Sequence, residues 1–183
     1  QRQMCIRDRV YIDATGDGDL AAWSGASFKR GYDEEGSVQM SSLCFSFANI
    51  DSYDYINGPT LYVWKDESTP LYKAVRSGKY PLVDTHFCNK LVGPDVIQCN
   101  AGHMTVDTTD PWAISEAMIL GRQKAVQYLE AMKDVRPSTF SNAFVVKTAS
   151  LLGVRDSRRI EGDYIFTVED WRPVSYTHLT LPT

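Results

Sequence analysis

The chain has little of three things: basic charge, paired cysteine and continuous apolar sequence. Its 183 residues include 19 Lys and Arg against 23 Asp and Glu, a formal net charge of −4. Proteins that bind nucleic acid carry strongly basic surfaces, so we expect no nucleic-acid partner. The apolar runs are far shorter than the ~20 residues that a membrane-spanning helix needs, so we expect no membrane span.

The cysteines are few, and their spacing suits neither a zinc site nor a disulfide network. Cys5 lies in an atypical first stretch, and Cys44, Cys88 and Cys99 include no C-x-x-C pair. Isolated cysteines in odd number disfavour both a zinc site and a disulfide network. We therefore predict no metal site, and free thiols that suit a reducing cytoplasm.

The two ends do not continue the patterns beside them. Residues 1–9, QRQMCIRDR, and residues 174–183, VSYTHLTLPT, resemble translated sequencing-adapter sequence of the kind found in fragmentary metagenomic reading frames. We exclude both as foreign segments. The informative part, residues 10–173, is then expected to be an internal fragment of a longer protein, and its sequence does not show the native termini or any signal peptide.

The clearest predicted element is a helix over residues 111–134. Asp110 is a good N-cap and Pro111 suits the first turn. Small and apolar residues recur at helical spacing up to Met132. Gly121, in the middle, indicates close approach to a neighbouring element, and the sequence RPS at 136–138 ends the helix.

Shorter segments predict the rest of the fold. We expect strands at 10–14, 38–48, 96–100 and 103–106, a strand or an extended buried run at 144–152, and short helices at 20–25 and 71–77. The alternation in 38–48 and 96–106 is typical of half-buried antiparallel strands. The fold class is therefore α/β, or α+β for a fragment, with a sheet covered on one side by the 111–134 helix.

The stretch DATGDGDLAA, residues 13–22, permits several interpretations. Gly16, Gly18 and Ala21 satisfy the spacing of a dinucleotide-binding turn. Asp17 and Asp19, however, would place negative charge beside a pyrophosphate. A calcium loop starting at residue 13 fails at its twelfth position, residue 24, which is Ser where a bidentate Glu is needed.

Two blocks resemble motifs of one flavoprotein family. VYIDATGDGDLAAWSGA (10–26) and GVRDSRRI (153–160) are similar to the I-D-A-T-G-D-G-D and G-V-R-E-S-R-R-I motifs of FAD-dependent oxidoreductases with a glutathione-reductase-like FAD domain. Asp156 stands where Glu is usual. Residues 36–51 resemble the family's intervening strand, with Met40 after Gln39 where Pro is usual. The resemblance covers nearly all of residues 10–172.

The resemblance implies FAD as the cofactor and divides the chain. Residues 10–35 become the returning segment of the Rossmann-like FAD-binding domain, and residues 36–173 an incomplete, mainly antiparallel substrate-side domain. Ala14, Thr15, Gly16 and Asp17 become cofactor-binding residues, with Thr15 and Gly16 near the diphosphate or adenosine. The family's primary glycine turn and its closing segment are expected outside this chain, so we expect the fragment alone to be inactive.

Two residues are candidates for catalysis. Hydride transfer to flavin N5 leaves negative charge on the ring, which a fixed cation such as Arg155 stabilises; an Arg also holds a polar substrate by a two-point fork. Its alternative role is a salt bridge with a nearby acid. His103 is a candidate general acid or base, and its alternative, like that of His86, is a structural role.

The predicted function is hydride transfer between a small organic substrate and flavin, in an internal fragment of an FAD-dependent oxidoreductase. The alternative is a non-catalytic α/β binding or structural module whose Gly- and Asp-rich turn matches by chance. The sequence specifies neither the substrate, the electron acceptor nor the oligomeric state.

Overall fold

The computed structural model describes residues 10–32, 36–165 and 167–171. They fall into two compact units. Residues 38–157 form the larger unit, and the smaller unit combines the chain up to Ser37 with the chain from Arg158. The domain ranges 10–35 and 36–173 stay predictions. The segments 1–9 and 174–183, which we interpret as foreign, lie outside the described residues.

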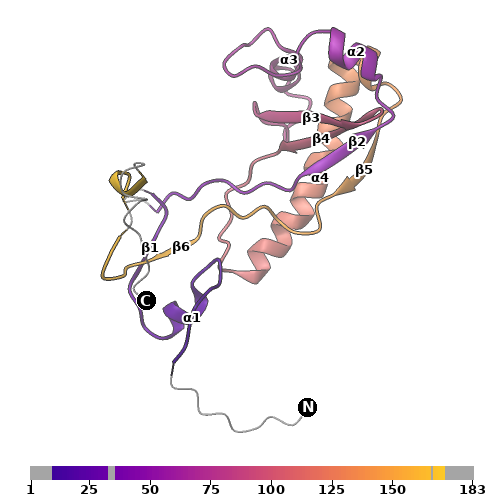
Figure 1. Ribbon diagram of the computed structural model, residues 1–183. Coiled ribbons are helices and arrows are strands. Elements are labelled where there is room, and N and C mark those ends of the chain that lie inside the picture. The colour runs from indigo at the N-terminus through magenta and orange to yellow at the C-terminus, as the bar shows by residue number, and fades with distance from the viewer. Residues whose placement is uncertain (1–9, 33–35, 166, 172–183) are drawn as a thin grey trace, which may run out of the picture. The chain divides into compact units, whose positions relative to one another are not determined.

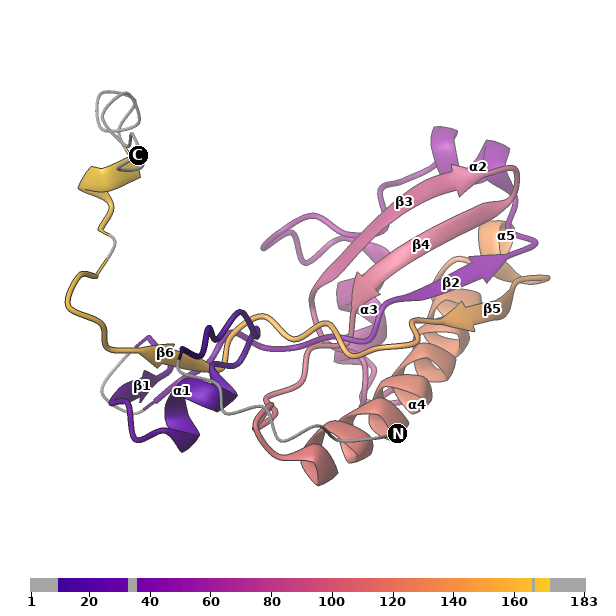
Figure 2. The same ribbon diagram turned by 60° about the horizontal axis from the view of Figure 1, so that its bottom comes forward.

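A four-stranded antiparallel sheet is the centre of the larger unit. Its strands are β2 (Phe45–Ala48), β3 (Phe87–Gly93), β4 (Val96–Ala101) and β5 (Phe144–Thr148), in the order β3-β4-β2-β5. Helix α4 (Pro111–Val135) runs along one face of this sheet (Figures 1 and 2). The mixed α/β class and the helix-covered sheet are confirmed.

Helix α4 begins and ends where its sequence predicts. The Asp110 carboxylate accepts a hydrogen bond from the Trp112 N–H at 2.9 Å, which satisfies one of the free donors of the first turn. Pro111 occupies the first turn and Val135 is the last helical residue. The buried residues repeat at helical spacing: Ala117, Gly121, Ala125, Tyr128, Ala131 and Met132. Propensity, capping and periodicity agree here, so local sequence determines the helix.

Aromatic side chains fill the core between α4 and the sheet. The Tyr128 ring lies 5.6 Å from Phe45 and 5.4 Å from Phe87, centroid to centroid. Phe47 meets Phe140 edge-on at 6.4 Å. Helices α3 (Pro70–Arg76) and α5 (Pro137–Phe140) add Leu71, Ala74 and Phe140 to this core, and the partly buried Tyr55 of α2 (Ser52–Asn57) packs against it. The face of the sheet turned toward α4 is therefore its apolar face.

Several predicted strands differ from the observed ones. Of 38–48 only β2 is a strand; before it, Ser41 and Ser42 make isolated bridges to Met104 and Gly153. The predicted strand at 103–106 is wrong, because Met104 pairs only at that one bridge. β5 ends at Thr148 rather than 152. Strand β3 was not predicted, since its sequence FCNKLVG alternates weakly in polarity.

The pairing of β2 with β5 contains a register shift. Ser46 lies opposite Lys147, whereas Phe47 lies opposite Val145, so β5 has one residue more than β2 at this point. Because of this extra residue, Val145 and Lys147 lie on opposite faces of the sheet although they are two residues apart. Val145 packs against the core, and Lys147 lies with Ser46 on the other face.

The smaller unit contains α1 (Asp19–Trp23), β1 (Phe28–Arg30), β6 (Arg158–Ile160) and the 3₁₀ turn η1 (Glu169–Trp171). β1 and β6 pair antiparallel. The predicted strand at 10–14 is wrong: these residues have no strand hydrogen bonds, and Val10 and Ile12 are exposed. A strand needs a neighbour for its backbone groups, and no strand among the described residues pairs with this segment.

Candidate functional site

Arg155 lies on the face of the sheet opposite α4, which we call the open face. Its Nη2 donates to Ser42 Oγ at 3.2 Å and to Asn100 Oδ1 at 3.1 Å. Ser42 Oγ also donates to Asn100 Oδ1 at 2.7 Å. These partners are neutral, and Arg155 has no ion pair within the described part of the chain. The guanidinium is thus held in place with its full positive charge available.

Gly153 allows this arrangement. Its N–H donates to the Ser42 carbonyl at 2.9 Å, and the Ser42 N–H donates back to the Gly153 carbonyl at 3.4 Å. A Cβ atom at Gly153 would come within 2.9 Å of the Ser42 carbonyl oxygen. This glycine therefore lets the two backbones approach closely, and it places Arg155 two residues later beside Ser42.

His103 follows β4 and is held by a carboxylate. Its backbone N–H donates to Asp84 Oδ2 at 2.8 Å, and its Nδ1 lies 3.8 Å from the same oxygen. Burial lowers the pKa of His103, the negative charge of Asp84 opposes this, and the charges of His86, Arg155 and Lys124 add to the lowering. The imidazole is therefore neutral at pH 7, which is the form that accepts a proton.

His86 completes a histidine pair that the sequence does not indicate. The His86 and His103 rings lie 4.6 Å apart. The Asp84 carboxylate also accepts the His86 backbone N–H, through Oδ1 at 2.9 Å. Asp84 thus ties together the segments that carry both histidines. The Asp-x-His spacing of an Asx turn at 84–86 is the only local signal that points to this role.

Two further groups adjoin the pair. Cys88 Sγ lies 3.3 Å from His86 Nε2, and Cys88 is paired across the sheet with Asn100, which holds Arg155. The Tyr62 ring lies 5.6 Å from His86, and its buried hydroxyl has no hydrogen-bond partner within the described residues. The structure therefore brings Arg155 and His103, both predicted catalytic residues, to one end of one sheet.

The turn at residues 13–18 belongs to the smaller unit, and Asp13 organises it. Its Oδ1 accepts from the Thr15 N–H at 2.9 Å and the Thr15 hydroxyl at 2.7 Å, and its Oδ2 accepts from the Ala21 N–H at 2.8 Å. These bonds, that of the Thr15 hydroxyl first, lower the pKa of Asp13. The sequence interpretation missed this role, although Asp two residues before Thr is a common turn signal.

The neighbouring residues of this turn differ in their surroundings. Gly18 precedes α1 with a φ of 61°, a conformation that favours glycine. Asp19, in the first turn of α1, forms an ion pair with Arg158. The backbone carbonyl of Asp17 accepts from Arg158 Nη1 at 3.2 Å. A Cβ atom at Gly16 would meet nothing within 4 Å, so this side of the turn is open.

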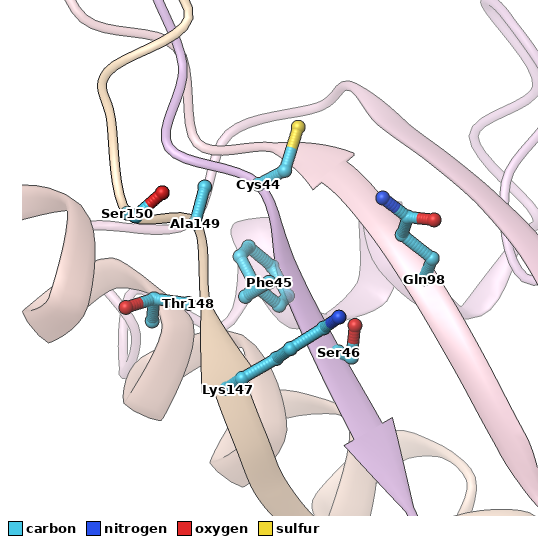
Figure 3. Close-up of a pocket in the computed structure, with 8 residues that line it drawn as sticks. All are labelled: Cys44, Phe45, Ser46, Gln98, Lys147, Thr148, Ala149 and Ser150. Carbon is cyan, nitrogen blue, oxygen red and sulfur yellow. The ribbon is translucent and has the colours of Figure 1, made fainter.

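A hollow of about 390 Å³ lies on the open face of the sheet (Figure 3). It is lined by Cys44, Phe45, Ser46, Gln98, Lys147, Thr148, Ala149 and Ser150. Gln98 of β4, Ser46 of β2 and Lys147 of β5 lie opposite one another across three strands. In Figure 3 the Lys147 side chain extends across β2 toward Ser46.

Comparison with known proteins identifies the family. A sequence profile described as FAD dependent oxidoreductase matches residues 2–177. The chain belongs to the FAD-dependent oxidoreductases. No curated protein and no solved structure matches it. The profile match includes most of residues 1–9 and the first residues of 174–183, the two segments that we interpret as foreign.

FAD is the cofactor of this family, and the turn at 13–18 is the segment predicted to contact it. Asp13 fixes the backbone of Thr15, and the open side of Gly16 leaves room for a ligand against the main chain. Ala14 and Asp17 flank these two residues. Their contact with FAD, like that of Thr15 and Gly16, stays a prediction.

Within residues 10–32, 36–165 and 167–171, no group of three or more His, Cys, Asp or Glu side chains is arranged to hold a metal ion. In the same residues, no helix has the length and apolar character needed to cross a bilayer.

Proposed function

We propose that the chain is an internal part of an FAD-dependent oxidoreductase that transfers a hydride between a small organic substrate and flavin. Membership of the family supports redox chemistry in general terms. The more specific reaction rests on the cluster of Arg155, His103 and Asp84 at one end of the sheet. We further place the enzyme in the cytoplasm, which suits the free thiols of Cys44, Cys88 and Cys99.

His103 is the proposed proton acceptor. When an alcohol or amine is oxidised, its carbon loses a hydride and its heteroatom loses a proton. Nδ1 of His103 faces Asp84, so Nε2 is the ring nitrogen that takes this proton. Asp84 is then a positioning residue: it fixes the backbone of His103 and stabilises the imidazolium that forms.

Arg155 is the proposed source of fixed positive charge. Bound FAD supplies the acceptor for the hydride, and the transfer creates negative charge that a nearby guanidinium stabilises. Ser42 and Asn100 hold the guanidinium before any substrate arrives, so little reorganisation is needed. In the smaller unit, Thr15 and Gly16 are the proposed contacts to the cofactor, with Ala14 and Asp17 beside them.

The observation that carries the proposal is the Arg155 guanidinium, which bonds to neutral side chains alone among the residues that the structure describes. An exposed arginine gains little from an ion pair, so the informative feature of Arg155 is that two side chains hold its guanidinium in place. Arg158, three residues later, does form such a pair, with Asp19. Arg155 instead contacts Ser42 and Asn100.

The test uses the full-length, FAD-loaded protein and stopped-flow measurement of flavin reduction. Arg155→Ala is expected to slow reduction about a hundredfold, the cost of losing one preorganised charge-stabilising donor. FAD affinity, measured by titration, changes less. Arg122→Ala, an exposed arginine of α4, is the matched control and leaves both values unchanged. An unchanged reduction rate in Arg155→Ala, with only lowered stability, would overturn the role of Arg155.

A further inference from the structure

The four strands of the larger sheet contain no acidic residue. Their sequences, FSFA, FCNKLVG, VIQCNA and FVVKT, have Lys90 and Lys147 as their only charged residues. Arg155 adds a third positive charge on the open face, beside Asn100. The whole chain has a net charge of −4, so this concentration of positive charge is opposite in sign to the rest of the molecule.

One row of side chains crosses the open face from edge to edge. Lys90 lies opposite Gln98, Gln98 opposite Ser46, and Ser46 opposite Lys147. The last three also line the hollow of Figure 3. The hollow therefore presents an ammonium, a hydroxyl and an amide, all of which donate hydrogen bonds to an anionic oxygen.

The Lys147 ammonium is free to take a ligand. Its side chain is exposed, and it has no ion-pair partner within the described part of the chain. The hollow lies within the size range of small-molecule sites, at about 390 Å³. Among the described residues that line the hollow, Lys147 alone is charged, and a single positive charge matches a carboxylate better than a phosphate dianion.

We propose that this hollow binds the carboxylate of an organic-acid substrate, with Gln98, Ser46 and Lys147 as its contacts. Asn100, which holds Arg155, is two residues from Gln98 along β4, a separation of about 7 Å on the same face. An acid whose carboxylate lies in the hollow therefore extends its other end toward Arg155. Only the description of this acid as substrate rests on the proposed function; its binding does not.

The test measures binding of adipate, a six-carbon dicarboxylate, to the 183-residue chain without FAD, by NMR chemical-shift changes at constant ionic strength. Adipamide, its neutral isostere, is the ligand control. We expect adipate, but not adipamide, to shift the signals of Gln98 and Ser46. Lys147→Gln is expected to raise the adipate Kd about tenfold, as loss of a charge-assisted hydrogen bond does. Lys73→Gln, an exposed lysine of α3, leaves it unchanged.

Cys44, which lines the hollow, provides a second measurement that needs no ligand. Positive charge nearby accelerates alkylation by anionic iodoacetate relative to neutral iodoacetamide. The ratio of the two rates at Cys44, followed by mass spectrometry, is expected to fall about threefold in Lys147→Gln at low salt, where screening is weakest. In Lys73→Gln the ratio stays at its original value.

The outcomes are distinct. Equal binding of adipate and adipamide, or an adipate Kd that Lys147→Gln does not change, overturns the carboxylate site. Tighter binding of inorganic phosphate than of adipate also overturns it, in favour of a phosphate site. None of these results affects the test of Arg155 in flavin reduction, so failure of this inference is distinguishable from failure of the proposed function.

Discussion

Gly121 of α4 packs directly against Leu43: a Cβ atom at Gly121 would lie 2.6 Å from the Leu43 Cβ. Alanine is normally favoured over glycine inside a helix by about 1 kcal/mol. Here the added methyl group has no room, because Leu43 is fully buried in a small cluster with Met104, Val106 and Ala117. Gly121→Ala is therefore expected to destabilise the protein by about 1–3 kcal/mol, the usual cost of overpacking.

Urea unfolding followed by circular dichroism measures this change. Gln123→Ala, at an exposed position two residues later on the same helix, is the control and leaves stability nearly unchanged. In a Leu43→Gly background, which removes the Cβ that the new methyl group would meet, Gly121→Ala is expected to cost less stability than it does in the original protein. An increase in stability for Gly121→Ala alone would contradict the close packing.

The pKa of His103 is expected to respond in opposite directions to its two neighbours. Burial lowers this pKa, Asp84 opposes the lowering and His86 adds to it. Asp84→Asn therefore lowers the pKa of His103 further, and His86→Gln raises it. Titration of the imidazole C–H signals by NMR measures both shifts. Changes of the same sign in the two variants would be inconsistent with this arrangement.

The same histidine gives a pH dependence of stability. Its folded pKa lies below the ordinary value of 6.5, so the unfolded state binds the proton more readily. The contribution of His103 to stability is therefore present in full above pH 6.5 and falls as the pH drops toward the folded pKa. His103→Gln is expected to make the urea midpoint depend less on pH in this window. His86→Gln is the comparison variant, because the His86 ring lies against that of His103.

Asp54 is expected to control stability in acid. Its Oδ2 accepts hydrogen bonds from Thr139, Ser138 and Arg136, and the bond from Thr139 is the largest cause of its lowered pKa. This contribution is present above the ordinary pKa of 3.8 and is lost as the pH falls through the lower folded value. Asp54→Asn makes the urea midpoint less sensitive to pH in acid, whereas Glu130→Gln, exposed on α4, does not.

Asp13 is expected to protect the turn that carries the predicted cofactor contacts. Both of its oxygens are used, one by Thr15 and one by Ala21. An asparagine has only one acceptor oxygen, so Asp13→Asn loses one of the two attachments and speeds amide hydrogen exchange at Ala21 or Thr15. Asp17→Asn, which leaves both Asp13 oxygens in place, is the control for hydrogen exchange in the chain without FAD. In the full-length enzyme, Asp13→Asn also weakens FAD binding if Thr15 and Gly16 contact the cofactor.

Helix α4 could be predicted because its signals are local in the sequence. The histidine pair could not, because it depends on strand pairing between distant segments. The cap at Asp110 and the spacing of the buried residues lie within the helix itself. His86 and His103, in contrast, meet because β3 pairs with β4, with Phe87 opposite Ala101. The sequence of β3 gives no clear alternation, so neither the strand nor the approach of the two rings follows from local pattern.

The outcome for the arginines has a similar cause. Alternation along a strand distinguishes the face of Arg158 from that of its neighbours but does not name its partner. Arg158 pairs with Asp19, which is far away in sequence. Arg155 is placed by the bridge between Ser42 and Gly153, another long-range contact. The sequence singled out Arg155, and tertiary contacts determine that Arg158 pairs with Asp19 whereas Arg155 bonds to Ser42 and Asn100.

The bulge in β5 means that the strand can lose one residue without changing the face on which Lys147 lies. Phe144-Val145-Val146-Lys147 has one residue more than the opposite part of β2 requires. Deleting either adjacent valine leaves a regular strand in which the remaining valine faces the core and the lysine still faces outward. A deletion in β2 would disturb the pairing with both neighbours, because β2 lies between β4 and β5. Natural length variation in this sheet is therefore expected at the two valines.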